Sequence, residues 1–504
     1  MSAAATPDTI FAPATAAGRA AVAILRLSGP AAGQAVTALA GGLPPPRAAW
    51  RRRLVDPATG EALDDALVLW FPAPASLTGE DVAEFQLHGS RAVLAAVVAA
   101  LRRLGLRLAE PGEFSRRAFL NGKLDLTQAE AIADLATAET EAQRRQALRQ
   151  LDGALGELYH SWARRLALAL AHLEAAIDFP DEDLPREIEA GITAEIAALG
   201  GEIACHLADG HRGERLRDGI AVAIIGPPNA GKSSLLNRIA GREAAITSPY
   251  AGTTRDIVEV AIDLAGYPVV LADTAGLRDS SNPVEQEGLR RARARAAMAE
   301  IRLFVFDARN PAEAAGAAAW LGPDTILVAN KIDLLPDKPP CAVSQPAGKH
   351  FQTAMPGLDP GISAPETRDA HQEGGVDAQD GPGHDGSRPA GPLAPVPALP
   401  DQALPGRALA VSALTGEGLD ALLGMLGERI AANYRVEAPV LTRARHREAL
   451  EDAAAALARA AAAALPELRA EDLRLAWRRL GRITGSVDVE DLLDIIFRDF
   501  CLGK

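Results

Sequence analysis

The N-terminal part of the chain alternates short apolar runs with turns rich in Gly and Pro. Residues 21–27 and 66–71 are apolar runs of strand length, and residues 91–104 repeat apolar positions at helical spacing. Short strands mixed with a helix are typical of a compact α+β domain. We therefore predict such a domain over residues 1–124.

Two later stretches, residues 125–217 and 433–504, carry Ala, Leu, Glu and Arg at helical spacing. The first stretch is interrupted at residues 179–182, whose sequence FPDE is expected to end a helix. Helices with apolar faces must bury those faces against one another. We therefore predict that the two stretches pack together as one discontinuous α-helical domain, and that residues 218–432 are inserted into it.

The inserted segment alternates strand-like and helix-like patterns. Buried strands of a parallel sheet are continuous apolar runs, because helices cover both faces of such a sheet. The alternation therefore predicts a mostly parallel α/β sheet. The runs that we interpret as buried strands are residues 221–225, 258–264, 269–272, 303–306, 326–329 and 409–411.

One part of the insertion does not fit a compact domain. Residues 336–406 contain 14 Pro and 10 Gly, which resist regular secondary structure. We predict a disordered loop there. A longer loop adds only about 2 kcal/mol of closure entropy relative to a short connection, so the sheet can tolerate it.

Composition limits the classes of protein that remain. Of the 504 residues, 48% are hydrophobic, which excludes global disorder, and the net charge of −14 opposes direct binding to nucleic-acid phosphates. The longest clean apolar run, residues 92–101, is too short to span a membrane, and no signal peptide is evident. Three cysteines, Cys205, Cys341 and Cys501, cannot form a disulfide framework. We expect a cytoplasmic protein.

A phosphate-binding loop is expected at residues 226–233, where the sequence GPPNAGKS follows an apolar strand and precedes a helical pattern. Its glycines allow backbone N–H groups to approach phosphates, and Lys232 would reach the β- and γ-phosphates. Ser233 would bind Mg²⁺.

Three further motifs follow in the order that a guanine-nucleotide site requires. Residues 273–276 read DTAG, residues 330–333 read NKID, and residues 412–414 read SAL. The carboxylate of Asp333 can accept two hydrogen bonds from guanine, which adenine cannot supply. The sequence therefore predicts GTP as the ligand. The motif residues expected to contact it are Asn229, Ala230, Gly231, Lys232, Ser233, Ser234, Asp273, Thr274, Ala275, Gly276, Asn330, Lys331, Asp333, Ser412, Ala413 and Leu414.

Catalysis is expected to differ from that of Ras-type GTPases. The water-orienting Gln of those enzymes is replaced by Leu277, so another group must orient the water. Residues 252–256 would form the first switch, with Thr254 as a second Mg²⁺ ligand. The side-chain carbonyl of Asn229 could hold a monovalent cation beside the phosphates. Alternatively, Asn229 is only a turn former.

Five further motifs resemble the MnmE (TrmE) family of bacterial tRNA-modification GTPases. They are ILRLSG at 24–29, TGED at 78–81, PGEFS at 111–115, FLNGKLDL at 119–126 and FCLGK at 500–504. The resemblance extends over the whole chain except residues 336–406. It implies a multidomain fold: an α+β N-terminal domain for folate binding and dimerisation, a discontinuous α-helical domain, and an inserted Ras-like α/β P-loop GTPase domain.

The resemblance also implies site residues. Glu285 would be the catalytic acid that acts through water in place of the missing Gln. The folate, 5-formyl- or methylene-tetrahydrofolate, would bind at Arg26, Glu84, Lys123 and Lys504. A K⁺ ion would bind at Asn229, Ser248, Tyr250 and Thr253, of which Ser248 and Thr253 would also border the GTP.

Cys501 stands beside the proposed folate ligand Lys504, so it is a candidate nucleophile or thiol acid/base. Its alternative role is that of a small buried apolar residue in a terminal helix. The sequence leaves both open.

The family's partners give the expected function. A homodimer would bind the FAD-dependent protein MnmG in a heterotetramer or larger complex. Together they would install a carboxymethylaminomethyl-type group at C5 of the wobble uridine of certain tRNAs, with K⁺-stimulated GTP hydrolysis driven by dimerisation of the GTPase domains. MnmG would supply much of the basic surface for tRNA, assisted locally by residues 51–53 or 443–447.

Two other classes remain at this point. A ribosome-associated GTPase switch of the Era type shares the nucleotide motifs, but it would need a basic RNA-binding module, which the sequence does not contain. A folate-sensing scaffold without useful hydrolysis is the second alternative.

Overall fold

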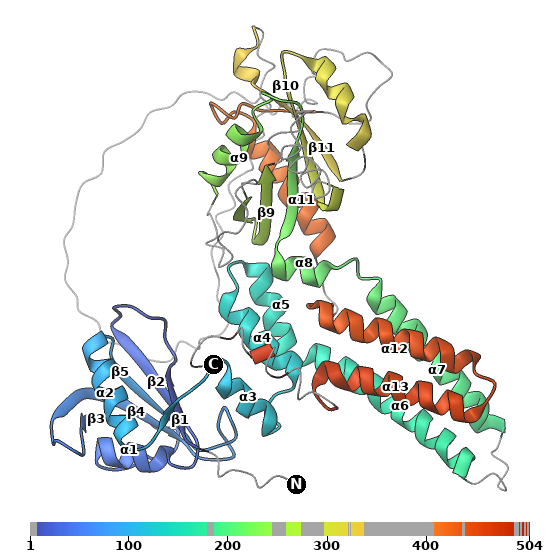
Figure 1. Ribbon diagram of the computed structural model, residues 1–504. Coiled ribbons are helices and arrows are strands. Elements are labelled where there is room, and N and C mark those ends of the chain that lie inside the picture. The colour runs from blue at the N-terminus through green and yellow to red at the C-terminus, as the bar shows by residue number, and fades with distance from the viewer. Residues whose placement is uncertain are drawn as a thin grey trace, which may run out of the picture.

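The computed structural model describes residues 8–178, 186–243, 259–273, 297–320, 322, 324–336, 408–435, 439–487, 493, 496–497, 500 and 503. Within these residues, three parts are evident in Figure 1: an N-terminal sheet with two helices on it, a bundle of long helices, and a second sheet connected to the bundle through α8 (Arg212–Asp218).

The N-terminal sheet has six strands in the order β3-β4-β5-β2-β1-β6. All neighbours are antiparallel except β1 and β6. Helices α1 (Ala32–Ala40) and α2 (Arg91–Arg103) share one apolar core with the sheet, and the Ser90 hydroxyl caps α2 by accepting from the Val93 N–H. The strands are β1 (Ile10–Pro13), β2 (Val22–Ser28), β3 (Trp50–Val55), β4 (Ala62–Phe71), β5 (Val82–His88) and β6 (Arg107–Leu108).

The long helices come from both sides of the insertion. Helices α6 (Ala154–Asp178) and α7 (Arg186–Leu207) pack with α12 (Ala444–Ala462) and α13 (Pro466–Thr484) around one apolar core. The predicted discontinuous helical domain is therefore observed. Short helices α3 (Glu113–Leu120), α4 (Leu126–Thr137) and α5 (Glu141–Leu151) precede this bundle, and capping boxes begin both α4 and α5.

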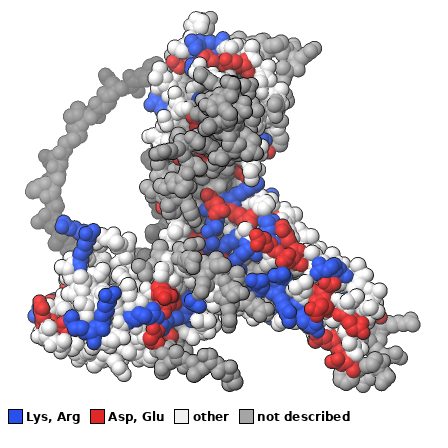
Figure 2. Space-filling view, viewed as in Figure 1, with Lys and Arg blue, Asp and Glu red and all other residues white. Residues whose placement is uncertain are grey.

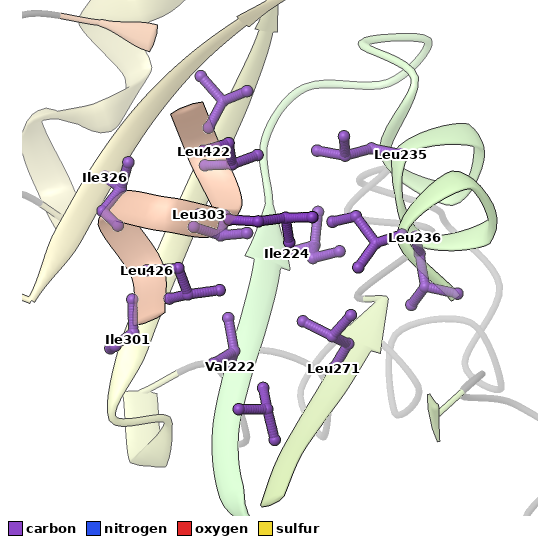
Figure 3. Close-up of a cluster of buried hydrophobic side chains, with 14 of the residues drawn as sticks. Val222, Ile224, Leu235, Leu236, Leu271, Ile301, Leu303, Ile326, Leu422 and Leu426 are labelled. Atoms are coloured by element: carbon purple, nitrogen blue, oxygen red, sulfur yellow. The ribbon is translucent and has the colours of Figure 1, made fainter. Parts of the chain in front are cut away.

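The second sheet has the order β12-β11-β10-β7-β9-β8. Its strands are parallel except for β8, which forms an antiparallel hairpin with β9. Apolar side chains of β7, β9, β10 and β11 meet those of α9 and α11 on one face (Figure 3). The elements are β7 (Ile220–Ile225), α9 (Lys232–Ala240), β8 (Glu259–Leu264), β9 (Tyr267–Asp273), β10 (Ile301–Asp307), η1 (Pro311–Trp320), β11 (Thr325–Asn330), η2 (Ile332–Leu334), β12 (Leu409–Ala410) and α11 (Leu419–Tyr434).

The predicted fold class is confirmed: an α+β part, a divided helical part and an inserted, mostly parallel α/β part. The predicted loop at residues 336–406 lies, apart from Pro336, outside the described residues and stays a prediction. Among the helices that the structure describes, none has the length and apolarity needed to cross a membrane.

Polar contacts join the insertion to the helices beneath it. The Ala142 N–H of α5 donates to the Gly266 carbonyl in the β8–β9 turn at 2.9 Å, and the Gln143 amide donates to the Arg217 carbonyl at 3.0 Å. Where the chain returns from the insertion, Arg445 and His446 contact the buried carboxylate of Glu130. Both connections are therefore fixed to α4 and α5.

Candidate functional site

The loop after β7 has the backbone conformation of a phosphate-binding loop. Gly226 has φ of 142°, and a Cβ there would lie 2.0 Å from the Val305 carbonyl oxygen. Gly231 has φ of 89°, and its Cβ would lie 2.3 Å from Nδ2 of Asn330. Only glycine fits either position, because a Cβ would meet both steric and backbone strain. The loop then leads into the N-terminus of α9, where orphan N–H groups favour anions.

Lys232 opens α9 and is buried inside this loop. Its ammonium group donates to the carbonyls of Gly226 at 3.1 Å and Pro227 at 2.9 Å. Burial lowers the pKa of Lys232, and the nearby Asp273 opposes that shift. The cation thus lies within the loop, at a position suited to bind phosphate oxygens.

Ser233, a predicted Mg²⁺ ligand, lies in contact with Asp273 of the DTAG motif. The Ser233 hydroxyl donates to Oδ2 of Asp273 at 2.5 Å. The other carboxylate oxygen, Oδ1, is buried and has no hydrogen-bond partner among the described residues. Hydroxyl and carboxylate oxygens are ligands that Mg²⁺ prefers, so this residue pair fits that ion.

Asn330 joins three of the predicted motifs. Its Nδ2 donates to the Ala230 carbonyl at 2.8 Å, and its Oδ1 accepts from the Ala413 N–H at 3.0 Å. Parallel β11 and β12 lie next to each other, so their carboxyl ends bring the NKID and SAL residues to one edge. The Ser412 hydroxyl then donates to Oδ1 of Asp333 at 2.6 Å. This edge is where a base would bind.

Four other predicted residues lie on the same motifs or on α9. Lys331 donates to the Asn229 carbonyl at 2.5 Å, and both residues have positive φ. The Leu414 carbonyl accepts from Arg238 at 2.5 Å, while the Leu414 side chain is exposed. Ser234 is the third residue of α9.

The remaining predicted site residues lie outside the described part of the chain. Their assignments to GTP, Mg²⁺, K⁺, folate or catalysis stay predictions. They are Ser248, Tyr250, Thr253, Thr254, Thr274, Ala275, Gly276, Glu285, Cys501 and Lys504.

A second cluster surrounds Arg26 in the N-terminal sheet. Arg26 and Glu84 are cross-strand partners on β2 and β5, and they form an ion pair at 2.8 Å. The Arg26 guanidinium also donates to the carbonyl of Gly503 at 3.4 Å, although the two residues are 477 positions apart. The C-terminal motif therefore meets the N-terminal sheet at the predicted folate residues.

Lys123 lies on the segment that follows α3. Its ammonium group donates to the Pro74 carbonyl at 3.2 Å. The Asn121 amide donates to the Thr78 carbonyl at 2.7 Å, so the FLNGKLDL and TGED motifs meet in space. No contact among the described residues links Lys123 to Arg26.

Sequence reasoning missed a polar network beneath this cluster. Glu80 accepts from the Ser28 hydroxyl at 2.6 Å and from the Arg117 guanidinium at 3.2 Å. Arg117 also pairs with Glu113 at 2.9 Å. Ser28, Glu80 and Glu113 belong to the ILRLSG, TGED and PGEFS motifs. The polar residues of these motifs were therefore the sequence signal for the network.

Three features lie at the carboxyl ends of a mostly parallel sheet: a glycine-rich loop around a buried lysine, the contact of Ser233 with Asp273, and the meeting of the NKID and SAL motifs. Together they define a P-loop GTPase as the class of protein. The comparisons with known proteins agree. The model described as MnmE helical domain matches residues 126–501, and the model described as GTP-binding protein TrmE N-terminus matches residues 9–123.

Relatives match over their full length. A tRNA modification GTPase MnmE of Rhodospirillum rubrum is 54% identical over 99% of this chain and 100% of its own. One of Parvibaculum lavamentivorans is 52% identical over the same shares of the two chains. The match to the solved G domain of the T. maritima FeoB iron transporter covers 43% of this chain and 99% of that domain, at 19% identity and a TM-score of 0.23.

The chain therefore belongs to the MnmE family of tRNA modification GTPases. The Era-type alternative is set aside, because the family match includes the N-terminal and helical parts as well as the nucleotide motifs.

Proposed function

We propose that this chain hydrolyses GTP to support modification of the wobble uridine of certain tRNAs. The proposal that the site binds GTP depends on the contacts of Asn330. Its side chain hydrogen-bonds to Ala230 in the phosphate loop and to Ala413 in the SAL motif, and so joins the two. A nucleotide spanning the two would place its phosphates at Lys232 and its base at Asp333. The carboxylate of Asp333, oriented by Ser412, selects guanine.

Two ions complete the proposed site. Mg²⁺ would be held by Ser233 and Thr254, with Asp273 close to it, as the buried, unpartnered Oδ1 of Asp273 supports. K⁺ would be held by Asn229 together with Ser248, Tyr250 and Thr253, and it would supply positive charge beside the phosphates. Glu285 would orient the attacking water through a bridging water, since Leu277 cannot.

The cluster around Arg26 is proposed as the folate site. A guanidinium suits the carboxylates of a folate, and the neighbouring Glu84 carboxylate can accept from a pterin ring. Lys123 and Lys504 would add further cations. The folate would supply the one-carbon unit of the modification.

The proposed assembly is a cytoplasmic homodimer that works with MnmG. Figure 2 supports the need for a partner in tRNA binding, because basic and acidic side chains are interspersed over the helical bundle on the face shown. With a net charge of −14, long-range attraction to tRNA must come from elsewhere. Residues 51–53 would help locally.

The test uses the full chain in two assays. First, single-turnover GTP hydrolysis is measured in KCl and in NaCl at equal ionic strength, for the unmodified protein and for Asn229→Ala. We expect fast hydrolysis only in KCl, and loss of that dependence in the variant. Equal rates in the two salts for the unmodified protein would remove the K⁺ site, and no hydrolysis in either would favour a folate-sensing scaffold.

Second, tRNA nucleosides are analysed by mass spectrometry in a strain that lacks this protein and in the same strain complemented with the chain. The modified wobble uridine should disappear without the protein and return with it. A normal level in the deletion strain would contradict the tRNA role.

A further inference from the structure

The carboxylate of Asp307 makes contacts that the GTPase motifs do not account for. Asp307 is the last residue of β10, and it is the register partner of Asn330 on β11. Its Oδ2 lies 3.0 Å from Nζ of Lys331, the second residue of the NKID motif. Asp307 itself belongs to none of the nucleotide motifs.

Lys331 is held at two points. Its ammonium group contacts Asp307 on one side, and on the other it donates to the carbonyl of Asn229 in the phosphate loop. Its backbone has φ of 68°, a left-handed conformation that a non-glycine residue adopts at a cost of about 1 kcal/mol. The contacts at the far end of the side chain stabilise a backbone turn that otherwise costs energy.

Arg309 holds Asp307 in turn. Its guanidinium donates to Oδ1 at 3.0 Å and to Oδ2 at 2.7 Å, and its backbone N–H donates to Oδ1 at 3.0 Å. Four hydrogen bonds thus fix the carboxylate, and only the one from Lys331 leads to the nucleotide site. Arg309 and Lys331 hold the pKa of Asp307 well below its usual value, so the carboxylate is charged.

We propose that Asp307 is a positioning residue for guanine-nucleotide binding, which holds Lys331 in place between the β10 end and the Asn229 carbonyl of the phosphate loop. The inference rests on the proposed nucleotide site. Without the carboxylate, the Lys331 ammonium group keeps, among the described residues, its contact with Asn229, and its side chain is held less firmly where the proposed site would bind the nucleotide.

A purely structural role is the competing explanation, because Asp307 also closes the turn that leads from β10 into η1. A double-mutant cycle separates the two roles. Binding of a fluorescent GDP analogue is measured for the full chain with Asp307→Asn, with Lys331→Ala, and with both changes together. Thermal unfolding of each variant checks the fold.

We expect Asp307→Asn to raise the Kd for the analogue about tenfold, since a charge-assisted contact is lost. In the Lys331→Ala background, the same change should raise Kd less than about twofold, because the residue that Asp307 positions is already gone. Equal effects in both backgrounds would mean that Asp307 acts through the turn, and the proposal would be wrong.

Two controls sharpen the comparison. Asp420→Asn makes the same chemical change in an exposed ion pair with Arg242, neither residue of which is a predicted nucleotide contact, and should leave Kd unchanged. Asp307→Ser retains an oxygen that can accept from the Arg309 N–H, so the turn survives while the charge is lost. It should weaken binding as Asp307→Asn does, and it replaces that variant if the latter does not fold.

The outcomes keep the two proposals apart. An unmodified protein that does not bind the GDP analogue contradicts the proposed function itself. An unmodified protein that binds it, with Asp307→Ser and Asp307→Asn binding equally well, contradicts only the role of Asp307.

Discussion

The hydroxyl of Ser412 donates a 2.6 Å hydrogen bond to Oδ1 of Asp333, and thereby fixes the plane of that carboxylate. The two residues come from different motifs, 79 positions apart. Ser412 is fully buried, and its Oγ also accepts from the Thr415 N–H at 3.0 Å, which directs the hydroxyl proton toward Asp333. In the proposed site, guanine recognition would thus be shared between Asp333, which would contact the base, and Ser412, which holds the Asp333 carboxylate.

The first prediction concerns this pair. Asp333→Asn should shift preference from GTP toward XTP, because an amide can donate to the 2-keto group where a carboxylate cannot. Ser412→Ala should keep the preference for GTP but raise its Kd about fivefold, since one hydrogen bond of about 1 kcal/mol is lost. Competition binding with GTP, XTP and ATP measures both. Unchanged GTP selectivity in Asp333→Asn would remove Asp333 from the base site.

The second prediction compares two glycines. Gly226→Ala should prevent the phosphate loop from forming, because the new Cβ would lie 2.0 Å from the Val305 carbonyl. Gly201 lies on α7, where a Cβ would meet nothing within 4 Å. Gly201→Ala should therefore raise the free energy of unfolding by up to about 1 kcal/mol. Urea titration of both variants, with GDP binding, checks the contrast. Tight GDP binding by Gly226→Ala would contradict the steric argument.

The third prediction is a dependence of stability on pH. Burial lowers the pKa of His446 below its usual 6.5, and Arg445 lowers it further, although Glu130 opposes this. In the unfolded chain the imidazole takes up a proton near pH 6.5, while in the folded protein it does so only at a lower pH. Its stabilising contribution is therefore present above pH 6.5 and is lost as the pH falls below that value.

Other groups act in the same direction. Burial also lowers the pKa of His206. Arg445 holds the pKa of Glu130 low in spite of its burial, so the contribution of Glu130 is lost only below its usual 4.5. The urea midpoint should fall between pH 7 and about pH 5.5, and His446→Gln should flatten that fall. An equally steep fall in the variant would assign the dependence to other groups.

How far the sequence predicts the fold depends on the pattern of each element. Strands β7, β10 and β11 are continuous apolar runs and were predicted to within two residues at each end. Strand β3, by contrast, is an edge strand that reads WRRRLV, with three consecutive arginines among its 6 residues. Nothing in its local pattern indicates a strand. The strand forms because its backbone pairs with β4, a tertiary contact that local propensity does not reveal.

The candidate site shows the same division. The NKID and SAL motifs were found from the sequence, because recognition of guanine requires particular residue types at these positions. The contact of Asp307 with Lys331 was not predicted, because it depends on the register between β10 and β11. The approach of Gly503 to Arg26 is likewise a tertiary contact, and only the resemblance suggested it.

The fourth prediction separates hydrolysis from binding. Glu285→Ala should cut GTP turnover by about a hundredfold or more while GTP affinity stays near normal, because a residue that orients the attacking water acts mainly in the transition state. Glu285→Gln, which keeps the size of the side chain, is the matched variant. Single-turnover rates and equilibrium binding measure the two effects. Turnover that survives in both variants would give the role to another group.

The last prediction concerns Cys501. Its neighbour Phe500 is buried against Leu126 and Ala129 of α4. This contact agrees with the alternative that Cys501 is a small apolar residue with a packing role. Gly503, two positions after Cys501, accepts a hydrogen bond from Arg26. In the sequence, Cys501 therefore lies between a residue of the apolar cluster and a residue that contacts the proposed folate ligand Arg26.

A thiol near that cation would have a lowered pKa and could act as nucleophile or acid/base on the one-carbon unit. Cys501→Ser should then keep dimerisation, folate binding and K⁺-dependent GTP hydrolysis, but abolish the modified wobble uridine. Cys501→Ala should do the same, since it lacks the sulfur but is also small and apolar. Mass spectrometry of tRNA nucleosides from strains that carry each variant decides between the roles. Normal modification in the Ala variant would return Cys501 to a packing role, because the chemistry would then not need the sulfur.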